Sequence, residues 1–213
     1  MRQLGVAMIT YTAENKDCFP HYDPAFAPTH DLVRYFANDL VLMCPSAPDP
    51  VAAPESVVGG YLLGGASFAY VEGRIDLTGD GVNDLLIGGY GRNGMANRMG
   101  AWPSQFVPVE NYFDRIDATD ARVPLFADCM WTAGFPGATF GSGDQPSMWE
   151  YGPDMPLDSF GLPRFAIRRH EHNINVVFAD GHARGVYLPD LWTLRWHANW
   201  KDQGPMNLPW LNE

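Results

Sequence analysis

One segment near the C-terminal end carries side chains that could together bind a metal ion: His170, His172, Asp180 and His182. Imidazole is a common metal ligand, and on a strand His170 and His172 would point to the same side. However, a strand over 173–179 would hold the Asp180 turn roughly 20 Å from His172, at about 3.3 Å per residue. Only a segment that folds back along this strand would bring His170 near Asp180. The favoured interpretation is structural: His170 braces a hairpin by hydrogen bonding, and Asp180 and Gly181 make its turn.

A second candidate site is a calcium loop that begins at Asp76. Its oxygen ligands would be Asp76, Thr78, Asp80, the carbonyl of Val82, and Asp84. A hard cation prefers several oxygens, and Gly81 permits the tight turn that such a loop needs. Ile87 stands where an EF-hand has a bidentate glutamate, so we expect Ca²⁺ to bind in the weak, extracellular range. The alternative is a solvated turn whose glycines are needed only by the backbone.

Nucleophilic catalysis has no support in the residue pattern. None of the serines lies in a Gly-x-Ser-x-Gly elbow. Cys129 follows Asp128, and a neighbouring carboxylate favours the neutral thiol. We therefore expect that the protein is not an enzyme. Cys18, Cys44 and Cys129 allow three different single disulfides, each leaving one thiol over.

The composition limits the classes of partner and of fold. The chain has 213 residues and a net charge of −11, so we expect one domain over 1–213 that does not bind nucleic acid. Its 22 glycines and 18 prolines favour short strands joined by turns. No apolar run approaches the roughly 20 residues of a membrane-spanning helix.

The apolar pattern predicts the elements that position these residues. Leu4, Met8 and Tyr11 share one face of a helix over 1–16. Thr29 is a suitable N-cap for a second short helix that carries Leu32 and Phe36. Short apolar runs between turn residues predict strands at 40–43, 68–71, 85–87 and 123–127.

The C-terminal third should contain a hairpin, a long loop and a last helix. Asp180-Gly181 between β-forming residues predicts a hairpin over 174–188 with a two-residue turn, pairing Val177 with Arg184. The segment 134–163 reads as a long loop. A helix over 190–200 would carry a stripe of three tryptophans: Trp192, Trp196 and Trp200. Burial is the ordinary explanation of such a stripe, and a sugar-binding platform is the alternative.

The spacing of His170, nine residues and then Asp180-Gly181 resembles the H-x9-DG signature of bacterial prepilin-type, pseudopilin-like proteins. Further segments occur in the order found in that family: residues 2–5, 44–46, 124–128 and 191–197. The resemblance implies an α+β fold like the head of a type IV pilin, with an N-terminal helix packed on an antiparallel β-sheet. Residues 1–16 would be the C-terminal part of a spine helix, whose hydrophobic upstream part is absent from this sequence.

The resemblance also implies a function. A member of this family would be a non-catalytic subunit of a cell-envelope filament or a type II secretion-like apparatus. Its partners would be other pilin or pseudopilin subunits and secreted cargo, on the periplasmic or extracellular face. Contact with the membrane would be made only through the upstream helix, so we expect this chain alone to be soluble and at most weakly oligomeric. The alternatives are an extracellular ligand- or carbohydrate-binding module and, less favoured, an envelope enzyme.

Overall fold

The computed structural model describes residues 1–21, 30–36, 39–47, 61–62, 64, 69–75, 84–98, 107–137 and 161–212. The chain opens with helix α1 (Arg2–Glu14), which buries one face that includes Leu4, Gly5 and Met8. The predicted N-terminal helix is therefore present, and its apolar face is the one that the spacing indicated. No helix among the described residues combines the length and the apolar character needed to cross a membrane.

The main sheet has five strands in the order β6-β4-β5-β7-β8. These are β4 (Tyr90–Asn93), β5 (Pro124–Asp128), β6 (Ala133–Gly134), β7 (Asn173–Phe178) and β8 (Ala183–Tyr187). Neighbouring strands are antiparallel except for β4 and β6, which are parallel. The fold is thus α+β, as expected, with a sheet that is antiparallel apart from its β6 edge.

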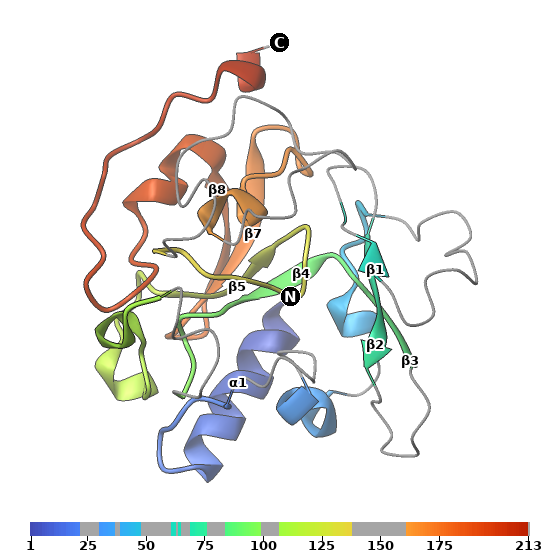
Figure 1. The fold of residues 1–213 in the computed structure, drawn as a ribbon, viewed down its shortest axis with the longest axis vertical. Coiled ribbons are helices and arrows are strands. Elements are labelled where there is room, and N and C mark those ends of the chain that lie inside the picture. Colours follow the sequence, from blue (N-terminus) through green and yellow to red (C-terminus); the bar gives the residue numbers. More distant parts are fainter. Residues whose placement is uncertain are drawn as a thin grey trace.

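A smaller antiparallel sheet lies beside the first and contains β1 (Tyr61–Leu62), β2 (Tyr70–Ile75) and β3 (Asp84–Gly88). Gly89 alone separates β3 from β4, so the chain passes from one sheet into the other across a single residue. Figure 1 shows the two sheets next to each other, with α1 below the five-stranded sheet and the C-terminal segments on its other side.

The hydrophobic core has a layer on each face of the five-stranded sheet. Along β7, Ile174, Val176 and Phe178 belong to one cluster and Val177 to the other, because successive side chains of a strand point to opposite faces. The Val177 side packs against Leu4 and Met8 of α1. The opposite side packs against the C-terminal segment, which includes the aromatic rings of Phe165, Trp192 and Trp196.

The predicted hairpin is present as β7 and β8, but its register differs from the prediction by one residue. Val177 pairs with Ala183 and not with Arg184. The amide of Gly181 donates to the carbonyl of Phe178 over 2.9 Å, and Gly181 has a φ of +85°. The loop is therefore a three-residue turn whose last residue is left-handed, which adds a bulge and shifts the pairing.

The predicted helix over 190–200 is wrong. A 3-10 helix, η7 (Leu188–Thr193), ends before the stripe is complete. In an α-helix the carbonyls of Leu191 and Trp192 would accept backbone amides four residues on. Here they accept the indole N–H groups of Trp196, over 2.7 Å, and Trp200, over 3.2 Å, and these bonds replace the helical ones. Trp192 and Trp196 are fully buried, as the ordinary explanation expected.

Other predicted elements have mixed outcomes. The run 40–43 forms a 3-10 helix, η2 (Asp39–Leu42), and not a strand, since a short buried apolar run does not distinguish the two. Runs 85–87 and 123–127 correspond to β3 and β5, and β2 begins at Tyr70, inside the run 68–71. The second short helix is a 3-10 helix, η1 (His30–Tyr35). Its predicted N-cap, Thr29, and most of the loop 134–163 lie outside the described residues.

Candidate functional site

His170 is placed by a tight turn that precedes β7. The amide of Asn173 donates to the carbonyl of His170 over 3.0 Å, and the two residues form an isolated β-bridge. Within this turn Glu171 has a φ of 59°, a left-handed conformation that costs a non-glycine residue energy. The turn folds His170 back alongside β7, so that its ring faces Asn175 at 2.8 Å.

Asp128 is the last residue of β5, and its side chain is 0% exposed. Its Oδ2 accepts a hydrogen bond from the backbone amide of Asn175 over 2.6 Å, which ties the end of β5 to β7. Its Oδ1 lies 3.6 Å from the guanidinium of Arg169, whose side chain is also 0% exposed. A buried carboxylate needs such partners, because desolvation without them is costly.

Cys44 follows η2 and lies against the point where the two sheets meet. The amide of Gly89 donates to the carbonyl of Leu42 over 2.9 Å. A Cβ atom at Gly89 would lie 2.7 Å from the Cβ of Cys44, so a residue with any side chain there would push Cys44 away. The absence of a side chain at Gly89 thus allows the cysteine to approach the sheet.

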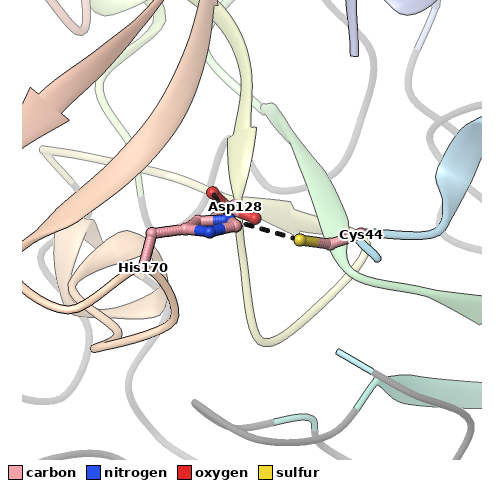
Figure 2. A group of neighbouring side chains, drawn as sticks. All are labelled: Cys44, Asp128 and His170. Atoms are coloured by element: carbon pink, nitrogen blue, oxygen red, sulfur yellow. Dashed lines mark hydrogen bonds and ion pairs between the residues drawn. The ribbon is translucent and has the colours of Figure 1, made fainter. Parts of the chain in front are cut away.

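Three side chains from these distant segments meet around one atom. The Nε2 of His170 lies 3.3 Å from the Sγ of Cys44 and 3.2 Å from the Oδ2 of Asp128. One sulfur, one oxygen and one nitrogen, all capable of binding a metal, lie within 4.8 Å of one another. Figure 2 shows the imidazole ring and the thiol directed toward each other, with the carboxylate beside them.

The electrostatic surroundings favour a neutral thiol at Cys44. Burial raises the pKa of Cys44, and the negative charge of Asp128 raises this pKa further. Burial and the nearby Cys44 likewise raise the pKa of Tyr90. In the absence of a cation, the cysteine is therefore a protonated, weakly nucleophilic group.

The geometry also differs from that of a catalytic triad. In such a triad the carboxylate binds the ring nitrogen that faces away from the nucleophile. Here Cys44 and Asp128 both face Nε2, while the other ring nitrogen, Nδ1, faces the hydroxyl of Ser46 at 3.3 Å. The arrangement suits a buried polar contact or a bound cation better than nucleophilic attack.

The structure does not bring together the four residues of the first candidate metal site. His170 and Asp180 lie at opposite ends of β7. At the tip of the hairpin, Nδ1 of His182 lies 2.5 Å from Oδ1 of Asp180, and the ring of His172 contacts that of Tyr187 edge-on. Asp180 and Gly181 do form the turn, as the structural interpretation expected.

The calcium loop lies outside the described residues except for Asp84, the first residue of β3. Asp76, Thr78, Asp80 and Val82 thus remain a prediction from the sequence. All three cysteines are free thiols in the structure, so none of the three disulfides that the sequence allowed is formed. Burial raises the pKa of Cys129 to about 12, which makes this thiol unreactive.

Sequence reasoning did not identify Cys44 and Asp128 as partners of His170. Asp128 is next to Cys129 in the sequence, whereas the structure directs its carboxylate toward Cys44. A signal was nevertheless available. Residues 44–46 and 124–128 are two of the segments on which the prepilin-type resemblance depends, and the structure places them beside the histidine of the H-x9-DG spacing.

Comparison of the chain with protein-family models, with curated proteins and with solved structures found no match. The physical features of the chain itself, together with the resemblance of its motifs, therefore carry the functional conclusion.

Proposed function

We propose that the protein is a non-catalytic pilin- or pseudopilin-like subunit of a filament or a type II secretion-like apparatus at the cell envelope. The observation that carries the proposal is the position of α1, which packs along the five-stranded sheet through Leu4, Gly5 and Met8. This helix-on-sheet arrangement is the one expected from the resemblance. The spacing of His170, Asp180 and Gly181 supports the same conclusion.

The outer face of α1 supports an assembly role. Val6 is 63% exposed on this helix and is the most exposed of the large hydrophobic side chains in the described ranges. Gln3 and Thr10, which lie on the same side as Val6, are exposed as well. In an assembly built around packed spine helices, this outer face is the part of α1 that neighbouring subunits would contact.

A structural role for the H-x9-DG histidine fits the same function. His170 lies against the ends of two central strands, through Asp128 of β5 and Asn175 of β7. It also contacts Cys44, next to the smaller sheet. Because these contacts join segments that are far apart in the sequence, they would hold those segments together in the assembled subunit.

The experiment is site-specific crosslinking in cells that produce the full-length gene product. A photoreactive amino acid at Val6 should crosslink to further copies of the protein or to other pilin-like subunits. The matched control is Tyr187, a large side chain that is 46% exposed on β8. If no crosslinks form at Val6, or if they form no more often there than at Tyr187, the proposed assembly through α1 is contradicted.

The gene provides an independent test. Upstream of Met1 the proposal requires a short basic leader, a cleavage site for a prepilin peptidase and a hydrophobic helix. An upstream sequence without these features would exclude assembly in the manner of pilins.

A further inference from the structure

We propose that Cys44, Asp128 and His170 form a three-ligand binding site for Zn²⁺. The site is distinct from the calcium loop predicted at 76–84, and it does not depend on the proposed assembly function. It would stabilise the junction between the two sheets and the turn that precedes β7.

The ligand types select the metal. Zn²⁺ is bound in proteins by cysteine sulfur, histidine nitrogen and carboxylate oxygen, and this site offers one of each. Ca²⁺ and Mg²⁺ are hard cations that prefer oxygen ligands, whereas a thiolate and an imidazole together favour zinc and its transition-metal neighbours. On binding, the thiol proton of Cys44 would pass to solvent as the Zn–S bond forms.

Two of the three distances between the ligand atoms are close to those around a tetrahedral ion. With bonds of about 2.3 Å to sulfur and about 2.0 Å to nitrogen and oxygen, tetrahedral angles place sulfur about 3.5 Å from nitrogen, and oxygen about 3.3 Å from nitrogen. The structure has 3.3 Å between Cys44 Sγ and His170 Nε2, and 3.2 Å between Asp128 Oδ2 and the same nitrogen. Both distances are within a few tenths of an ångström of the tetrahedral values, and the third pair, sulfur and carboxylate oxygen, lies within 4.8 Å.

His170 Nε2 cannot form hydrogen bonds with all of its polar neighbours at once, although the thiol of Cys44 can also donate to the carboxylate of Asp128. Three polar atoms surround His170 Nε2: Cys44 Sγ, Asp128 Oδ2 and Asn175 Nδ2, at 3.3, 3.2 and 2.8 Å. A neutral ring nitrogen carries either one proton or one lone pair, so it satisfies one of them. In addition, the buried Oδ1 of Asp128 accepts no hydrogen bond within the described part of the chain. A cation would bind the nitrogen, the sulfur and the carboxylate at once.

Neighbouring residues orient the three ligand side chains, and one side of the site is open to solvent. The Oγ of Ser46 lies 3.3 Å from His170 Nδ1, which is the kind of contact that orients a metal-bound imidazole. Asp128 is held by the amide of Asn175 and by Arg169. The side chain of His170 is 27% exposed, so solvent reaches one side of the site. A water molecule would complete the coordination as the fourth ligand.

The first experiment is a titration of the chelator-treated full chain with Co²⁺, whose spectrum reports its ligands. We expect one equivalent to bind, with a thiolate-to-cobalt charge-transfer band that added Zn²⁺ removes. Cys44→Ser should abolish this band. Cys18→Ser is the matched control, because Cys18 is a free thiol outside the cluster, and it should leave the band unchanged.

The second experiment measures thermal unfolding with and without Zn²⁺, and compares two histidine variants. His170→Gln should lose the stabilisation by Zn²⁺, with at least a tenfold weaker apparent affinity. His182→Gln, which alters the exposed His182–Asp180 pair, should retain it. Melting curves recorded in chelator establish that each variant is folded, so a lost response reports binding and not misfolding.

Two outcomes would overturn the proposal. One is a wild-type chain that shows neither a charge-transfer band with Co²⁺ nor a higher midpoint with Zn²⁺. The other is a response that persists equally in folded Cys44→Ser and His170→Gln, because the metal would then bind elsewhere. Neither readout depends on assembly, so failure of this site would leave the proposed function standing, and the reverse also holds.

Discussion

The Nε2 atom of His170 lies 3.3 Å from the sulfur of Cys44, although 126 residues separate the two in the sequence. The contact joins the segment after η2 to the turn before β7. Asp128, at the end of β5, lies against the same nitrogen. Three parts of the chain thus depend on one another at this point, and substitutions there should affect the stability of the whole domain.

Replacing Asp128 by alanine should lower the free energy of unfolding by about 3–5 kcal/mol, measured by urea denaturation. The change removes the ion pair with the buried Arg169 and the acceptor for the amide of Asn175. Asp117→Ala is the matched control, because it removes an exposed ion pair with Arg115 and should leave the midpoint nearly unchanged. A variant at 128 as stable as the wild type would show that this carboxylate does not hold the junction.

Gly5→Ala should destabilise the protein although alanine favours helix. The added Cβ would lie 2.6 Å from a methyl carbon of Val177, and Val177 is fully buried on β7. Overpacking costs about 1–3 kcal/mol, more than the helix propensity of up to about 1 kcal/mol returns. Gly185→Ala is the control, since a Cβ there meets no atom within 4 Å. Equal midpoints of thermal unfolding for the two variants would argue against close packing of α1 on the sheet.

Asn93→Ala should lower the free energy of unfolding by at least about 3 kcal/mol. The fully buried side chain donates to the carbonyls of Pro124 and Trp196, and its oxygen accepts the amide of Met95. Truncation leaves three buried backbone groups without these bonds, at about 1–3 kcal/mol each before relaxation. Denaturant titration measures the loss. Asn199→Ala removes an exposed hydrogen bond to the carbonyl of Glu110 and a partly buried one to Asn111. It should be milder, and the opposite ranking would refute this account.

The stability of the protein should fall between pH 6.5 and pH 4 partly because of His197. Burial, and then the charge of Arg195, lower the pKa of His197 to about 4. The unfolded chain, with a pKa near its ordinary value of about 6.5, binds the proton more readily in this range, so acid favours unfolding. The contribution reaches about 3 kcal/mol by pH 4. In His197→Phe, the loss of unfolding free energy between pH 6.5 and pH 4, measured by denaturation at each pH, should be smaller by this amount. An equal loss in the variant and the wild type would rule out the effect.

Calcium should raise the midpoint of thermal unfolding through the loop that begins at Asp76. The half-maximal effect should fall at about 0.1–1 mM, because the loop lacks the bidentate glutamate of an EF-hand. Asp80→Asn should reduce the rise in the midpoint that Ca²⁺ causes, and Mg²⁺ should raise the midpoint much less than Ca²⁺ does. A midpoint that does not change with the Ca²⁺ concentration would eliminate this site.

The sequence by itself determined the features that depend on neighbouring residues. The spacing of Leu4 and Met8 predicted the buried face of α1, and Asp180-Gly181 predicted the hairpin of β7 and β8. Periodicity and turn chemistry act over a few residues, so they can be recognised without knowledge of the fold.

Only the tertiary structure decided the features that depend on contacts between distant segments. The indole groups of Trp196 and Trp200 bond the carbonyls that a helix would have used, and no helical pattern reveals that competition. Likewise, Cys44 and Asp128 reach His170 because the junction of the two sheets brings their backbones together. Ligand atoms meet in space through the packing of strands, and the spacing of residues within one segment does not reveal which distant side chains they will meet.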